Sequence, residues 1–165
     1  MNDLRRIDYA DTFSINCPVG TTARDILLGF FSATPLAVRI LMAIRNWFVS
    51  LFGLKATRTI SPPDASLLQS GQRIGLFEIS SLTPTLAILG ADDAHLNFRV
   101  LLNVAGALVS CTTQVQFNNA AGRIYFFFVK PFHRLIVPAM LKACIKKLNQ
   151  KLQKTKVTTR QNKRG

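Results

Sequence analysis

The sequence predicts an α+β domain in which a curved antiparallel sheet wraps one long C-terminal helix. Two patterns carry this prediction. Apolar and polar residues alternate through residues 95–104 and 108–118, and a helical pattern then runs from about residue 123 to 152. The chain has 165 residues, 48% of them hydrophobic and 18% charged. This composition excludes a wholly disordered chain, and the length suits a single domain over residues 1–150 with a basic, disordered tail over 151–165.

The N-terminal third predicts one strand followed by two helices. Residues 8–16 alternate weakly and end at a Cys-Pro-Val-Gly turn, which is typical of a strand. Thr21 or Thr22 then caps a short helix, whose first turn carries Asp25 beside the positive end of the helix dipole. A Thr-Pro pair begins the second helix, over residues 34–52, and a glycine ends it.

A block of strands follows a loop over residues 55–72. Residues 73–82 and 85–89 predict two short strands, and residues 90–93 predict a turn. The two alternating segments named above are joined by a short turn that contains a glycine. They therefore predict an antiparallel hairpin with one buried face.

The last helix is expected to change character along its length. Residues 118–122 predict a turn, and Pro131 and Pro138 each remove a backbone hydrogen bond and favour a kink. From Lys142 onward the pattern is amphipathic. Its apolar stripe consists of Leu141, Ile145, Leu148 and Leu152.

Positive charge is concentrated in the C-terminal half. The formal net charge is +13, yet residues 1–93 are balanced, whereas residues 94–165 hold thirteen basic residues and no acidic one. The stretch between Lys142 and Arg164 predicts either a solvated tail or contact with an anionic membrane surface. Because aromatic residues are not interleaved with these lysines, we expect no specific nucleic-acid binding.

Targeting signals and chemical motifs are scarce. The N-terminus lacks an apolar run after a basic start, so we expect no signal peptide and a cytoplasmic protein. Cys17, Cys111 and Cys144 are far apart and odd in number, which predicts reduced, partly buried thiols. No nucleophile triad, metal-ligand spacing or glycine-rich phosphate loop is evident, so we predict no catalytic residues, no metal site and no cofactor.

The order of elements is that of the helix-grip fold. Three stretches also resemble a bacterial family, domain of unknown function 2867: DYADTF (8–13), FFSATPLAVRILMAIRNWFVSLFGLK (30–55) and GRIYFFFVKPFHRLIVPAMLK (122–142). That family is similar to the START-like (SRPBCC) superfamily. The resemblance implies a cavity between the sheet and the C-terminal helix that binds a small hydrophobic molecule or lipid. It also implies association with a short-chain-dehydrogenase-like protein, because members occur fused behind such domains.

The predicted ligand-binding residues combine apolar walls with a few polar groups. The apolar candidates are Phe98, Val100, Leu102, Val115, Phe117, Phe127, Phe128 and Leu135. The polar candidates, which would orient the ligand, are Glu78, Arg99 and His133.

Several alternatives stay open at this stage. Residues 126–128 can be core as well as cavity wall, and Glu78 with Arg99 can be an ordinary cross-strand pair. His133 can instead bond a backbone carbonyl freed by Pro131. The function can also be that of a cyclase- or isomerase-like enzyme in the same cavity. A further alternative is a peripheral membrane protein that handles lipid through its basic C-terminus.

Overall fold

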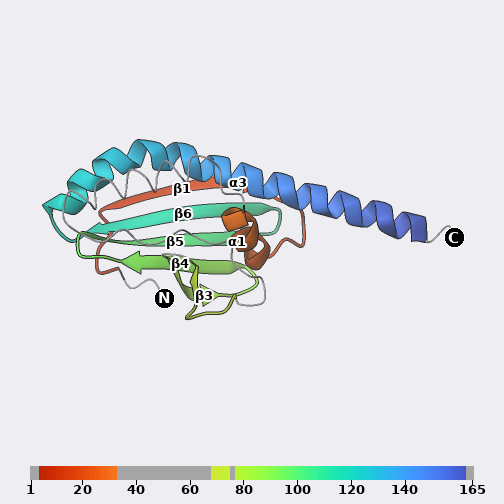
Figure 1. Cartoon of the computed structure of the whole chain (residues 1–165), viewed down its shortest axis with the longest axis horizontal. Coiled ribbons are helices and arrows are strands. Elements are labelled where there is room, and N and C mark those ends of the chain that lie inside the picture. The colour runs from red at the N-terminus through yellow and green to blue at the C-terminus, as the bar shows by residue number, and fades with distance from the viewer. Residues whose placement is uncertain (1–3, 33–67, 75–76, 163–165) are drawn as a thin grey trace.

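The computed structural model describes residues 4–32, 68–74 and 77–162, and it confirms the predicted α+β, helix-grip arrangement. Six antiparallel strands form one curved, unclosed sheet in the order β1-β6-β5-β4-β3-β2. A long helix, α3, runs along the sheet beside β1 and continues well beyond it (Figure 1). The strands are β1 (Tyr9–Asn16), β2 (Arg73–Ile74), β3 (Phe77–Leu82), β4 (Leu86–Asp92), β5 (Leu96–Ala105) and β6 (Leu108–Phe117).

Helix α1 (Ala23–Ser32) follows the first strand, as the sequence predicts. Thr22 is its N-cap: the Thr22 hydroxyl accepts a hydrogen bond from the Asp25 amide at 3.2 Å, and the Asp25 carboxylate accepts one from the Thr22 amide at 3.0 Å. This reciprocal pair satisfies two amides that the first helical turn leaves without partners. The second predicted helix, over residues 34–52, lies outside the described residues.

The alternating segments form the centre of the sheet. β5 and β6 pair along their whole length, from Leu96 opposite Phe117 to Ala105 opposite Leu108, so the predicted hairpin is confirmed. The turn predicted at residues 90–93 is wrong for its first part, because β4 continues to Asp92 and pairs with β5. Ala91 pairs with Phe98 there, which shows that cross-strand pairing overrides the weak strand propensity of Gly, Ala and Asp.

Helix α3 (Ala120–Asn162) starts earlier and ends later than the predicted helix. Asn119 caps its N-terminus, since the Asn119 side-chain oxygen accepts a hydrogen bond from the Gly122 amide at 3.0 Å. A Cβ atom at Gly122 would clash with the His95 carbonyl oxygen, so only glycine lets the first turn pack this closely against the start of β5. The helix continues without a break through Pro131 and Pro138 and across the boundary predicted at residue 150.

Two hydrophobic clusters lie between the sheet and α3. The larger one joins α1, the inner face of the sheet and the part of α3 between Ile136 and Ile145. The smaller one consists of Leu96, Val115 and Phe126, with partly buried Tyr9, Phe98, Phe117 and Tyr125 around it. The three cysteines are free and buried, as predicted.

Candidate functional site

Polar side chains meet α3 at the line between the two clusters. The alternation along β1 turns Tyr9, Asp11, Phe13 and Ile15 toward α3 and leaves the residues between them exposed. Asp11 stands opposite Thr113 of β6, which faces the same way. Asp11 and Thr113 therefore interrupt an otherwise apolar inner face.

Asp11 links the sheet to the helix. Its carboxylate accepts a hydrogen bond from the Tyr9 hydroxyl at 2.6 Å, and its other oxygen lies 3.2 Å from Nε2 of His133 on α3. The side chains of Asp11 and His133 are only 14% and 12% exposed. Lys130 adds a second contact, because its ammonium group lies 5.0 Å from the centre of the Tyr9 ring.

The Asp11 carboxylate also affects the titration of its neighbours. Burial raises the pKa of Tyr9 to about 12, and the hydrogen bond and negative charge of Asp11 act in the same direction. Burial likewise raises the pKa of the Cys111 thiol to about 12, with a smaller contribution from Asp11. Both groups therefore stay protonated at neutral pH.

Thr113 is the unusual member of this group. Its hydroxyl is the one buried side-chain oxygen or nitrogen, among the residues that the structure describes, that has no hydrogen-bond partner. A buried hydroxyl without a partner costs about 1–3 kcal/mol, so native proteins rarely retain one. We refer to Tyr9, Asp11, Thr113 and His133 together as the polar site.

The chemistry open to the polar site is that of hydrogen bonding and proton transfer. The Asp11 carboxylate can accept bonds from further donors, and the Thr113 hydroxyl can both donate and accept. An imidazole held by a carboxylate is also a suitable proton carrier. No group of three or more metal-ligating side chains occurs within residues 4–32, 68–74 and 77–162.

Five of the predicted wall residues lie on the inner face of the sheet. They lie on the inner face of β5 or β6, where their partners across the ladder are also apolar or belong to the polar site. Val100, for instance, pairs with Thr113. These five residues are Phe98, Val100, Leu102, Val115 and Phe117.

Three predicted wall residues lie on the wrong side of the helix. Phe127, Phe128 and Leu135 are 74%, 51% and 73% exposed and do not pack against the sheet. The helical period of 3.6 residues turns only one of three consecutive residues toward the sheet, and Phe126 occupies that position. Its ring packs against Tyr9, with 4.7 Å between the ring centres.

The predicted pair of Glu78 and Arg99 does not form. Glu78 is exposed and lies 3.4 Å from Arg73, whereas Arg99 forms two hydrogen bonds with Asp92, at 2.6 and 3.2 Å. Both residues fall between the inward-facing positions of their strands, so both lie on the face of the sheet opposite α3. Of the three polar candidates, only His133 turns its side chain toward the inner face of the sheet. There it contacts the Asp11 carboxylate rather than a backbone carbonyl freed by Pro131.

Sequence reasoning did not identify Tyr9, Asp11 and Thr113. A signal was present, because Asp11 is the one charged residue among the inward positions of an otherwise apolar strand face. Thr113 was equally visible on the apolar face of β6. The pairing of Asp11 with a residue 122 positions away in the chain was not visible.

Comparison with known proteins identifies the family. The family model described as "Protein of unknown function (DUF2867)" matches residues 4–140. The chain therefore belongs to this family, as its resemblance predicted. The match includes all four residues of the polar site, together with the first part of α3. A search among curated proteins finds no match.

Proposed function

We propose that this member of the DUF2867 family binds a small hydrophobic molecule with an uncharged polar head group between the sheet and α3. The observation that carries the proposal is the buried Thr113 hydroxyl, which lacks a partner although it stands directly opposite Asp11. A head group that donates to Asp11 and bonds Thr113 would satisfy both. It would thereby offset the cost of burying the hydroxyl.

The surroundings favour an apolar body for this ligand. On one side of the polar site lies the small aromatic cluster around Phe126, and on the other lies the large cluster under α1. Aromatic walls with a few converging polar groups are typical of sites for small hydrophobic molecules. The apolar part of the ligand would lie among Phe98, Phe117 and Phe126.

The charge of the site selects among head groups. Asp11 brings a carboxylate, so a fatty acid would place a second carboxylate beside it at an electrostatic cost. A long-chain alcohol donates a hydrogen bond without that repulsion. We therefore expect alcohols to bind and fatty acids of the same length to bind weakly or not at all.

Native mass spectrometry of the full chain with dodecanol and with dodecanoate tests this proposal. We expect a one-to-one complex with dodecanol and little with dodecanoate. Thr113→Val keeps the side-chain shape and removes the hydroxyl, so dodecanol affinity should fall about tenfold, or 1.4 kcal/mol. The matched control is Thr112→Val, whose hydroxyl lies on the other face of β6 and bonds Thr12 at 2.9 Å.

Unfolding in urea without added ligand gives the second measurement. The free energy of unfolding should stay constant or rise in Thr113→Val, because no protein partner is lost. Equal dodecanol binding by Thr113→Val and the parent chain would contradict the proposal. A lower free energy of unfolding for Thr113→Val without dodecanol would also contradict it, since this loss would show that the hydroxyl already has a partner such as water.

A further inference from the structure

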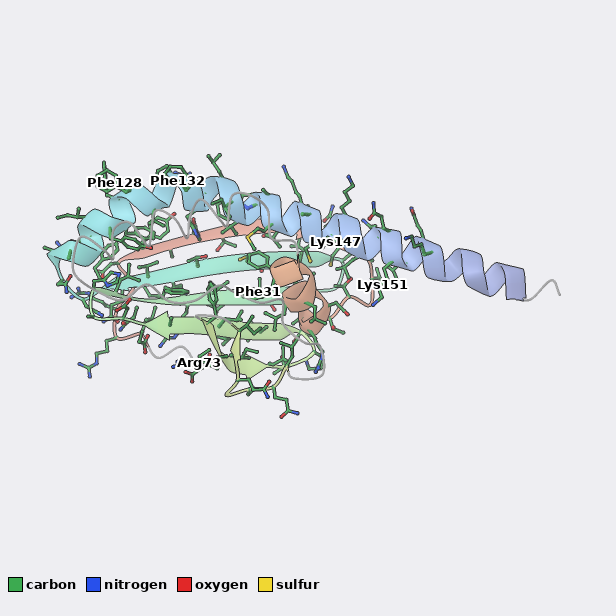
Figure 2. The ribbon with its side chains drawn as sticks, viewed as in Figure 1. Phe31, Arg73, Phe128, Phe132, Lys147 and Lys151 are labelled. Carbon is green, nitrogen blue, oxygen red and sulfur yellow. The ribbon has the colours of Figure 1, made fainter. Side chains whose placement is uncertain are left out.

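The outer face of α3 carries a continuous row of large exposed apolar side chains. We call Ile124, Phe127, Phe128, Phe132 and Leu135 the apolar ridge. Phe127 and Leu135 are the most exposed, at 74% and 73%. Figure 2 shows Phe128 and Phe132 pointing away from the sheet. Scattered exposed apolar residues are ordinary, but a contiguous row of this size marks an interaction surface.

The ridge is a second apolar face on the same helix. Its members recur at intervals of three and four residues, so they share one side of α3. The opposite side is already used, because Phe126, Val129 and Ile136 are buried beneath the helix. The ridge is therefore not part of the core that the described residues form.

Basic side chains accompany the ridge. Arg123, Lys130 and Arg134 are exposed and follow one flank of it, and Lys142 and Lys146 continue its face further along the helix. No acidic residue occurs anywhere in α3. An apolar face bordered by lysine and arginine, with no acid, is the pattern of a helix that lies in the interface of an anionic membrane.

We propose that the apolar ridge docks on an anionic lipid bilayer, with α3 lying in the plane of the membrane interface. This contact is distinct from the ligand site beneath the helix, and it is centred on residues 123–135 rather than on the tail beyond Lys142. The phenylalanines would enter the region between head groups and acyl chains. Arg123 and Arg134 would lie among the lipid phosphates.

Two other arrangements fit the ridge less well. A second copy of this chain would bring another acid-free helix, and another net charge of +13, against the first. Ala120–Lys154 is long enough to cross a membrane and contains an apolar window of 18 residues with a mean hydropathy of 1.3. Crossing would, however, strip the buried side of α3 from the sheet, break the Asp11–His133 contact and place His133 in lipid.

Sedimentation with vesicles tests the proposal on the full chain. We expect binding to vesicles of phosphatidylcholine and phosphatidylglycerol in equal parts, weak binding to phosphatidylcholine alone, and loss of binding at high salt. Phe127→Ser with Phe128→Ser should weaken binding at least about tenfold. Leu152→Ser is the control, because Leu152 is also an exposed apolar residue of α3 but lies outside the ridge.

Further variants separate the ridge from the basic tail. Arg123→Gln with Arg134→Gln should weaken binding to the anionic vesicles, whereas deletion of residues 155–165 should leave the requirement for Phe127 and Phe128 intact. Circular dichroism should show that each variant is folded.

Unchanged binding by the Phe127 and Phe128 double variant would overturn the proposal, as would equal binding to uncharged vesicles. If light scattering shows a dimer that this double variant dissociates, without any vesicle binding, the ridge is instead an interface between copies of the chain.

Discussion

The part of α3 that covers the sheet and α1 has two halves, residues 120–135 and 136–148. They differ in what they contact, although they belong to one uninterrupted helix. Residues 136–148 place an apolar face on α1 and the sheet, where Leu141 and Cys144 are almost fully buried. Residues 120–135 contact the sheet through a smaller aromatic cluster and the polar site, and they turn the apolar ridge to solvent. The second half therefore anchors the helix, and the first half offers surfaces that binding can use.

This difference follows from what lies beneath each half. Only the second half packs against α1, so its inner face meets side chains from two directions (Figure 1). Within the part of the chain that the structure describes, the first half covers the sheet alone, and Asp11 and Thr113 interrupt its apolar layer. Regions with fewer buried apolar contacts open at a lower free-energy cost, and binding sites tend to lie in them.

The largest expected effect compares two leucines of α3 with opposite burial. Leu141 is 2% exposed and Leu135 is 73% exposed. Leu141→Ala should lower the free energy of unfolding by about 2–5 kcal/mol, because it leaves a cavity in the core. Leu135→Ala makes the same chemical change on the same helix and should change that free energy by less than about 0.5 kcal/mol.

Urea unfolding followed by circular dichroism measures both variants under identical conditions. Similar losses of unfolding free energy in the two variants would contradict the difference in burial between the two halves. A large loss for Leu135→Ala alone would mean that the ridge is covered in solution, and this loss would then depend on protein concentration.

A smaller effect tests the contact between α1 and the second half of α3. A Cβ atom at Gly29 would overlap Sγ of Cys144, so Gly29→Ala should overpack the contact and lower the free energy of unfolding by about 1–3 kcal/mol. Alanine is otherwise the better helix former. Measured in a Cys144→Ala background, the same substitution should be neutral or stabilising by up to about 1 kcal/mol.

The double-mutant cycle of Gly29 and Cys144 isolates the steric term. A coupling free energy near zero would show that α1 and α3 are further apart in solution than in the structure. Equal m-values for the four proteins, that is, equal slopes of unfolding free energy against urea concentration, would confirm that only native packing has changed.

How much of this was predictable depends on the range of the interaction. Alternation fixes the face of each strand residue locally, so the inward positions of β5 and β6 and the hairpin between them followed from the sequence. The same local logic, applied to the helix, would have put Phe126 beneath α3 and Phe127 and Phe128 outside. Treating the three phenylalanines as one wall ignored the helical period.

The polar site could not be predicted from the sequence for a different reason. Asp11 and His133 lie at opposite ends of the domain in sequence, and only the position of α3 beside β1 joins them. The contacts of Glu78 with Arg73 and of Arg99 with Asp92 likewise depend on how the strands pair in the sheet. Local patterns specify which residues share a face, but not which faces meet.

The smallest expected effect on stability at neutral pH concerns two buried thiols, one near each half of α3. Burial raises the pKa of Cys111, beside the polar site, and of Cys144, against α1, from 9.0 to about 12. Both thiols should therefore resist iodoacetamide at pH 8 until the protein unfolds. Because the folded pKa values are raised, the stability they contribute is complete below pH 9 and is lost as the pH rises toward 12.

Asp11→Asn separates the two thiols. Removing the negative charge should lower the pKa of Cys111, where Asp11 contributes after burial, and leave that of Cys144 unchanged, where Lys147, Asp25 and Cys17 contribute instead. Alkylation followed by peptide mass spectrometry reports each cysteine separately between pH 8 and 11. Faster labelling of Cys111 alone would place the Asp11 charge where the structure has it. Equal acceleration at both positions would mean that the substitution loosens the whole domain, and that the polar site holds both halves of α3 rather than the first.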